Sequence, residues 1–173
     1  MNYSADIKKI ERHFLPNNFT VDTWEGLEPY YRNLLERPIN AEQDLEQWLK
    51  DISELEAVVG EDAAWRQIRM TCDTENKALE QSFAYFMMEI QPKIEPIADQ
   101  LNRKFIESPF IGKLDKQKFF TYIRSVKKNI DLFRQENIPI QAELNVMKQQ
   151  FGVISGKMTV EVNGQEYTLQ QAA

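Results

Sequence analysis

Apolar residues recur every three or four positions along most of the chain, which is the spacing of amphipathic helices. Near the N-terminus, Ile7, Ile10 and Phe14 follow this spacing and predict a helix over residues 4–15. Pro16 would end it, because a proline lacks the backbone donor that a helix needs and crowds the preceding turn. The pattern therefore predicts helical structure from the first segment onward.

Two patterns typical of capping boxes mark the next helix starts, one opened by Asp22 and one by Asn40. The first predicts a helix that ends near Pro38. The second predicts a longer helix that Gly60 interrupts and that resumes to about Thr71. One apolar stripe follows the longer helix: Leu45, Trp48, Leu49, Ile52, Leu55 and Val59, continued by Trp65 and Ile68.

A further helical run begins at Thr74, and its apolar spacing passes through Pro92 and Pro96 to Phe105. Either one helix kinks at the prolines, or a new helix starts with Pro92 in its first turn, where proline is tolerated. We expect the restart. A loop over residues 108–112 follows, because Ser-Pro and a glycine interrupt the pattern there.

The last two predicted helices begin at Asp115 and, with proline as first helical residue, at Pro139. Their apolar residues alternate between spacings of four and three, which suits nearly parallel helix packing. We expect both stripes to lie in the core. They are Phe119, Ile123, Val126, Ile130 and Phe133 in the first helix, and Ile140, Leu144, Met147 and Phe151 in the second.

After Gly152 the pattern changes to the alternation of a β-hairpin, with Asn163-Gly164 as a two-residue turn. That turn sets the predicted pairs Val162–Gln165, Glu161–Glu166, Val160–Tyr167 and Met158–Leu169. The hairpin is marginal alone, because two glutamates face each other and an isolated two-stranded hairpin has little stability. Its apolar face must therefore dock on another surface.

These elements predict an all-α (mainly helical) protein: an antiparallel helical lobe of long amphipathic helices with a C-terminal β-hairpin. The helical N-terminal lobe takes residues 1–156 and the hairpin residues 157–169. Residues 170–173 read like the truncated start of a next helix. We therefore expect the sequence to be one segment of a longer polypeptide.

The net charge of −6 argues against nucleic-acid binding, since such proteins usually present a basic surface to phosphates. One locally basic stretch runs from Lys113 to Arg134, with apolar residues interleaved at helical spacing. We interpret it as the solvated face of an amphipathic helix. The alternative is a contact with an acidic partner or another domain.

No stretch approaches the roughly 18 apolar residues of a membrane span, and the N-terminus has no apolar signal core. A single cysteine, Cys72, excludes an internal disulfide. We therefore expect no membrane partner and a cytoplasmic location.

The sequence lacks the residues that an active site needs. His13 is the only histidine, so neither a zinc site of the usual type nor a nucleophile–histidine pair can be assembled convincingly. Cys72 precedes Asp73, which disfavours the thiolate, and is better interpreted as a structural, partly buried cysteine. Acidic groups such as Glu42, Asp44 and Glu46 are expected on a solvated helix face. We predict no catalytic, no cofactor-binding and no metal-binding residue in this chain.

Several stretches resemble the N-terminal region of bacterial oligoendopeptidase F-like enzymes, which belong to the thimet-oligopeptidase family of zinc metallopeptidases. They are residues 12–40 (from RHFLP through ERPIN), 65–76 (WRQIRMTCDTEN, the closest match), 124–128 (RSVKK) and 158–172 (from MTV through YTLQQA). The resemblance spans nearly the whole chain but only about the first third of a family enzyme.

The resemblance implies a helical enzyme that encloses a deep channel, with zinc held by a His-Glu-x-x-His helix and a later glutamate. These residues lie C-terminal to this sequence, so no cofactor is expected in the fragment, although zinc is implied for the full-length enzyme. This chain would be the non-catalytic lobe, inactive by itself, that walls the channel and limits substrate size.

The implied partners are the missing C-terminal catalytic domain of the same polypeptide and short peptide substrates in the full-length enzyme. The hairpin would belong to the interface with that domain. The alternative is a stand-alone helical protein-interaction module.

Overall fold

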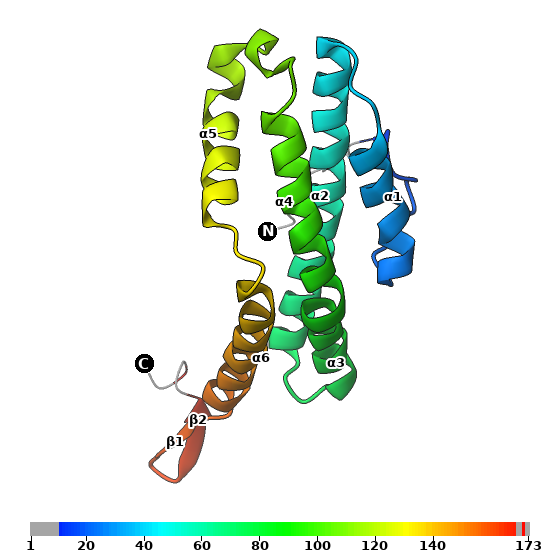
Figure 1. Cartoon of the computed structure of the whole chain (residues 1–173). Coiled ribbons are helices and arrows are strands. Elements are labelled where there is room, and N and C mark those ends of the chain that lie inside the picture. Colours follow the sequence, from blue (N-terminus) through cyan, green and yellow to red (C-terminus); the bar gives the residue numbers. More distant parts are fainter. Residues whose placement is uncertain (1–10, 169–170, 172–173) are drawn as a thin grey trace, which may run out of the picture.

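The computed structural model describes residues 11–168 and residue 171. Helices dominate these residues, and one antiparallel hairpin follows them, so the predicted mainly helical fold is confirmed (Figure 1). The α-helices are α1 (Trp24–Glu36), α2 (Glu42–Cys72), α3 (Lys77–Tyr85), α4 (Gln91–Ile106), α5 (Lys116–Leu132) and α6 (Asn137–Gly156). The other elements are the π-helical turn η1 (Phe86–Ile90), the 3-10 turn η2 (Ile111–Lys113) and the strands β1 (Thr159–Val162) and β2 (Gln165–Thr168).

The helix predicted over residues 4–15 is wrong for residues 11–15, which are the part of it that the structure describes. Residues 11–15 are irregular, and the rest of the 4–15 segment lies outside the described residues. The Glu54 carboxylate on α2 accepts the backbone N–H groups of His13, Phe14 and Leu15, at 2.8, 3.0 and 2.7 Å. Because these donors point to one distant side chain, they are not available for helical hydrogen bonds.

Helix α1 begins one residue later than predicted. Thr23 is its N-cap, with Oγ1 accepting from the Gly26 N–H at 3.4 Å. Asp22 instead accepts a hydrogen bond from the Thr20 hydroxyl at 2.8 Å. Asp22 as the cap is therefore wrong, although the helix itself is confirmed.

The other end of α1 is held by the neighbouring helices. Trp48 of α2 is fully buried and donates its indole N–H to the Leu34 carbonyl at 2.8 Å. Lys104 of α4 donates to the carbonyls of Leu34, Leu35 and Arg37, at 2.9, 2.7 and 2.6 Å. A cation from another helix thus satisfies carbonyls that α1 leaves without partners at its C-terminus.

Helix α2 runs unbroken from Glu42 to Cys72, so the predicted interruption at Gly60 is wrong. A lone glycine inside a helix costs only about 1 kcal/mol relative to alanine, which packing on both sides outweighs. The predicted cap at Asn40 is also wrong: Ala41 is the N-cap, and Asn40 only donates its backbone N–H to Asp44 at 2.9 Å.

The predicted α2 stripe is buried only in its first part. Its residues from Leu45 to Val59 lie in the core, whereas Trp65 and Ile68 are almost half exposed. Beyond Gly60 the packed face of α2 shifts to Arg66 and Met70, which face α3. The expectation that the stripe continues to Ile68 is therefore wrong.

The chain stays helical from Lys77 to Ile106, so no break precedes Pro92, but α4 begins at Gln91 with Pro92 in its first turn, as predicted. The N-cap Asn76, rather than the predicted Thr74, accepts from the Ala78 and Leu79 N–H groups at 3.1 and 3.4 Å. The π-helical turn η1 lies immediately before Pro92 and widens the helix by one residue per turn. This accommodates a proline that cannot take part in the regular α-helical hydrogen-bond ladder.

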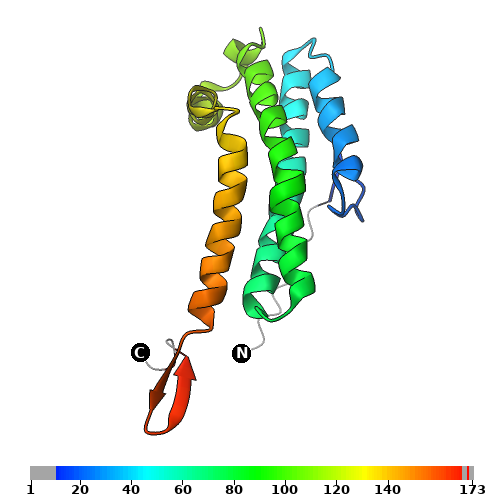
Figure 2. The same cartoon turned by 60° about the horizontal axis from the view of Figure 1, so that its bottom comes forward.

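Helix α5 packs along α4, and α6 packs against η1 and α4, while the hairpin extends beyond the helices (Figures 1 and 2). Asp115 caps α5 as predicted, accepting from the Gln117 and Lys118 N–H groups at 2.8 and 3.0 Å. Val126 of its apolar stripe is buried, and Phe119, Ile123 and Ile130 pack against the core. The core position is confirmed for these four residues, whereas Phe133, the fifth member of the stripe, is the C-cap residue of α5 and lies half-buried outside the core cluster.

The core position predicted for the α6 stripe is wrong. Its members are solvent-exposed, as is Ile154 one turn further: Ile140, Leu144, Met147, Phe151 and Ile154 form what is called here the α6 apolar face. Helix α6 contacts the bundle through its opposite side, which carries Ile138 and Gln149. Pro139 is its third residue rather than its first.

The hairpin register is confirmed for Thr159↔Thr168, Val160↔Tyr167, Glu161↔Glu166 and Val162↔Gln165, whereas the Leu169 pair lies outside the described residues. Asn163 and Gly164 have φ values of 54° and 77°, as a two-residue turn of this kind requires. Of the helix start predicted over 170–173, only Gln171 is described. It exchanges two hydrogen bonds with Thr168, at 3.0 and 3.3 Å, in the manner of a capping box.

Candidate functional site

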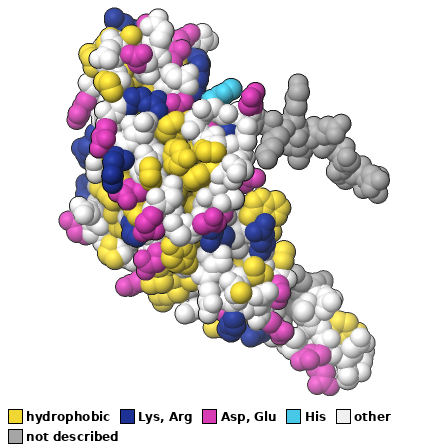
Figure 3. All heavy atoms as spheres, turned by 90° about the vertical axis from the view of Figure 1, so that its right-hand side faces the viewer, with side chains coloured by type: hydrophobic (Ala, Val, Ile, Leu, Met, Phe, Trp, Pro, Cys, Tyr) yellow, Lys and Arg dark blue, Asp and Glu magenta, His cyan; other side chains and the backbone are white. Residues whose placement is uncertain are grey.

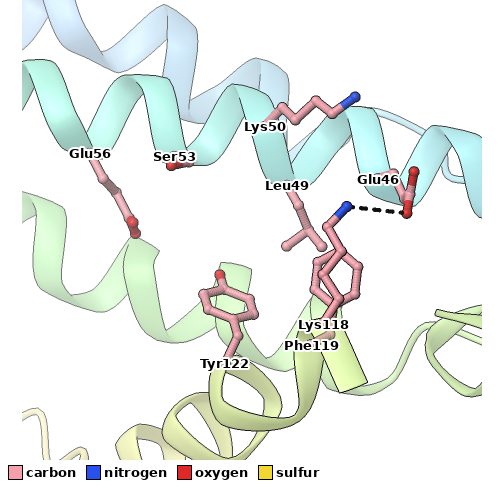
Figure 4. Close-up of a pocket in the computed structure, with 8 residues that line it drawn as sticks. All are labelled: Glu46, Leu49, Lys50, Ser53, Glu56, Lys118, Phe119 and Tyr122. Atoms are coloured by element: carbon pink, nitrogen blue, oxygen red, sulfur yellow. Dashed lines mark ion pairs between the residues drawn. The ribbon is translucent and has the colours of Figure 1, made fainter. Parts of the chain in front are cut away.

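A cleft of about 350 Å³ lies between α2 and α5 (Figure 4). It exists because α5 packs along α4 and leaves part of its other side separated from α2. Its lining combines aromatic, aliphatic and ionisable side chains: Glu46, Leu49, Lys50, Ser53, Glu56, Lys118, Phe119 and Tyr122. Such a mixture of apolar walls and a few polar groups is typical of ligand sites.

The two ends of this cleft differ electrostatically. At one end, Lys118 Nζ lies 3.9 Å from Glu46 Oε1, and the same ammonium lies 4.9 Å from the centroid of the Phe119 ring. Lys50 extends away from α5 (Figure 4). The positive charges of the cleft are thus either paired at that end or directed outward.

At the other end, Glu56 and Tyr122 project into the cleft from opposite walls (Figure 4). Among the residues that the structure describes, none forms an ion pair or a side-chain hydrogen bond with Glu56. The Glu56 side chain is solvent-exposed, and desolvation by the protein atoms near its carboxylate raises the pKa of Glu56 above its ordinary value.

The Tyr122 ring packs against the core, and its hydroxyl lies at the cleft. Its ring centroid lies 5.3 Å from that of the buried Phe105. Burial, with the nearby Glu56 charge as a second cause, raises the pKa of Tyr122 to about 12. Tyr122 is therefore protonated near neutral pH and can donate a hydrogen bond.

A second functional surface is the α6 apolar face, which leads into the hairpin. Phe151 is 71% exposed and Met147 63% exposed, values that a packed core residue would not have. Met158, Val160 and Val162 of the hairpin are also exposed apolar side chains. Apolar surface of this extent marks a contact region for another protein surface.

The residues discussed as possible chemistry stay apart. His13 is exposed before α1, and Cys72 is exposed at the end of α2. Within residues 11–168 and 171, no group of three histidine, cysteine or acidic side chains is arranged to hold a metal ion. The zinc that the family resemblance implies therefore finds no fitting donor set in this part of the chain.

Of the acidic residues expected on a solvated face, Asp44 is exposed, whereas Glu46 is half-buried in the cleft. The sequence did not single out Glu56 or Tyr122. Glu56 is one of 27 acidic residues, and its position opposite α5 depends on packing between distant helices. In the sequence, only the apolar stripe of α5 indicated a packed surface near Tyr122.

The surface charges are mixed. On the face that carries α1, acidic and basic side chains alternate around hydrophobic patches (Figure 3). The basic residues of α5 are solvent-exposed, in agreement with their interpretation as a solvated face: Lys116, Lys118, Arg124, Lys127 and Lys128. Among the helices that the structure describes, none has both the length and the apolar character needed to span a bilayer.

Comparison with known proteins gives one family match. The sequence model described as the Peptidase M3 N-terminal domain matches residues 14–133, which include the helices from α1 to α5 and both walls of the cleft. No curated protein and no solved structure matches the chain significantly.

Proposed function

The chain belongs to the Peptidase M3 N-terminal domain family, and from this premise we propose that it is the non-catalytic N-terminal lobe of a zinc-dependent oligoendopeptidase. The match confirms the resemblance to the thimet-oligopeptidase family. That the parent enzyme is of the oligoendopeptidase F type, acts on short peptides and works in the cytoplasm is part of the proposal.

The family match is the observation that carries this proposal, because it covers 120 of the 173 residues and names an N-terminal domain. In this view the lobe walls the substrate channel and limits the size of the peptides that enter.

The α6 apolar face and the hairpin are the proposed interface with the catalytic domain of the same polypeptide. Helix α6 carries apolar residues on two sides. One side packs on η1 and α4, and the other would pack on that domain. The same contact would supply the partner that a two-stranded hairpin needs for stability.

A peptidase assay tests the non-catalytic role. The purified chain is incubated with zinc and fluorogenic short peptides, with and without a chelator. We expect no chelator-sensitive cleavage. Cleavage that the chelator abolishes, and that co-purifies with the chain through two chromatographic steps, would contradict the proposal.

The reading frame beyond Ala173 separates this function from a stand-alone helical interaction module. Continuation into a His-Glu-x-x-His motif supports the peptidase lobe, since that motif would supply the zinc ligands. A natural stop codon after Ala173 would contradict it and favour the interaction module.

A further inference from the structure

The end of the α2–α5 cleft that holds Glu56 has an unbalanced negative charge. The cleft's own lysines do not neutralise it, because Lys118 pairs with Glu46 and Lys50 is directed away from α5. Glu56 is solvent-exposed, so its charge is hydrated in the free chain, but it is a carboxylate of the cleft without a cationic partner among the described residues. A positively charged group from outside would find its counter-ion there, and this is the ligand chemistry that the site favours.

The walls next to Glu56 suit a cation on an apolar stem. Leu49 projects into the cleft from α2, and the rings of Phe119 and Tyr122 face it from α5 (Figure 4). Methylene groups of a long side chain would pack against these apolar surfaces while the charge reaches the carboxylate. The Tyr122 ring can also contact a cation through its face.

We propose that this cleft binds a lysine or arginine side chain of a peptide, with Glu56 as the counter-ion and Tyr122 and Leu49 as the wall that holds the aliphatic stem. The choice of a peptide as the ligand rests on the proposed function. The cleft would thereby favour basic residues at one position of a peptide held by this lobe.

A free peptide N-terminus offers a similar ammonium group but no apolar stem. The cleft is about 350 Å³ in volume and is lined by Leu49, Phe119 and Tyr122 as well as by Glu56, so a bare α-ammonium at Glu56 would leave these apolar walls in contact with water. The side chain is therefore the favoured source of the cation, and both sources can be separated experimentally.

The test is a titration of the ¹⁵N-labelled chain followed by NMR, which detects weak binding and locates it. The probes are the capped peptide acetyl-Gly-Lys-Gly-amide, its arginine and norleucine analogues, and Gly-norleucine-Gly-amide with a free N-terminus. We expect saturable shifts around Ser53, Glu56 and Tyr122 with the lysine and arginine peptides. Both norleucine peptides should bind at least about ten-fold more weakly, because they lack the side-chain cation.

Variants identify the counter-ion. Glu56→Gln should weaken lysine-peptide binding by at least about ten-fold, because a charge-assisted contact is stronger than a neutral one. Tyr122→Ala should weaken it by a few-fold, because it removes the ring that packs against the aliphatic stem. Glu61→Gln, on the same helix but outside the cleft, should leave the affinity unchanged. Circular dichroism verifies that each variant keeps the helical content.

Equal affinity for the lysine and capped norleucine peptides, unchanged affinity in Glu56→Gln, or shifts confined to other surfaces would overturn the proposal. Tight binding of the free N-terminal norleucine peptide would overturn the assignment to a side chain. Since the titration measures binding by this chain alone, its failure leaves the peptidase assay and the reading-frame result unaffected, and the reverse also holds.

Discussion

Single polar side chains hold distant parts of this chain together. Arg66 of α2 donates to the Val21 carbonyl at 2.5 Å and to the Ser82 hydroxyl at 2.9 Å, which joins the segment before α1 to α3. Glu54 fixes the segment before α1 at another point through its three backbone donors. Each contact spans many residues of sequence, so it stabilises the tertiary arrangement rather than one element.

The Glu54 contact predicts a pH-dependent stability. Burial alone would raise the pKa of Glu54, but the three N–H donors outweigh it and hold the pKa below the ordinary value of 4.5. A carboxyl whose pKa is lower in the folded state stabilises the fold above its unfolded-state pKa. This stabilisation is lost as the pH falls through the lower, folded-state value. Glu54→Gln should therefore lower the free energy of unfolding by about 1–2 kcal/mol at pH 7.

Urea denaturation at several pH values between 7 and 3 measures this effect. The difference between the parent chain and Glu54→Gln should shrink once the pH falls below about 4.5, because a protonated glutamate resembles glutamine. Glu61→Gln is the matched control on α2 and should change the stability by less than about 0.5 kcal/mol. A difference that does not vary with pH would show that the carboxylate charge is not responsible.

Among the elements, α2 contains a residue that weakens it. Gly60 lies inside the helix, and nothing lies within 4 Å of the position that a Cβ would occupy. Gly60→Ala should therefore raise the free energy of unfolding by about 0.5–1 kcal/mol, because alanine loses less backbone entropy on folding. Thermal or urea unfolding followed by circular dichroism at 222 nm measures the change.

Gly164 provides the opposite case within the same chain. Here too, nothing lies within 4 Å of the position that a Cβ would occupy. However, the φ of Gly164 is 77°, and an L-residue adopts this conformation at a cost of about 1 kcal/mol. Gly164→Ala should accelerate amide hydrogen exchange in β1 and β2 while Gly60→Ala leaves the hairpin unaffected. Stabilisation by both alanines would contradict this account of the turn.

Local sequence rules predicted those elements whose determinants are neighbours in sequence. The Asp115 cap, the hairpin turn and the register around Asn163-Gly164 are confirmed, because each depends on residues a few positions apart. The predicted break at Gly60 is wrong, and the chain stays helical up to Pro92 in the first turn of α4, since packing against other helices maintains both segments. Three predicted caps shifted by one or two residues, to Thr23, Ala41 and Asn76, because more than one position near a helix start can serve as its boundary.

The candidate site was not predictable from the sequence. Glu56 and Tyr122 lie more than sixty positions apart in the sequence, on different helices, and neither stands out from its neighbours in the pattern. Their proximity results from how far α5 stands from α2, which periodicity does not determine. The exposed α6 apolar face was missed for a related reason: an apolar stripe indicates burial but not which partner provides it.

At the scale of the whole molecule, the exposed apolar surface is the main feature that the helical core does not explain. Met147 and Phe151 contribute nothing to that core, so Met147→Gln combined with Phe151→Gln should change the free energy of unfolding by less than about 0.5 kcal/mol. The same variant should bind less of a hydrophobic dye and self-associate less, because it presents less apolar surface.

Ile138→Ala is the control on the packed side of α6 and should cost about 2–4 kcal/mol. Urea denaturation, dye fluorescence and analytical ultracentrifugation measure the three properties. A double glutamine variant that is as unstable as Ile138→Ala would show that this face is packed in solution.

The position of Cys72 at the end of α2 makes it a suitable attachment point for a fluorescent label. It is the one thiol in the sequence and is exposed on the last residue of that helix. The neighbouring turn of α2, at Met70 and Thr71, shares a surface depression with Gly152 and Val153 of α6. A maleimide fluorophore would attach at this single point without engineering a new thiol, beside the helix end that leads into the hairpin. Its emission would then report directly on whether another surface covers that end of the molecule.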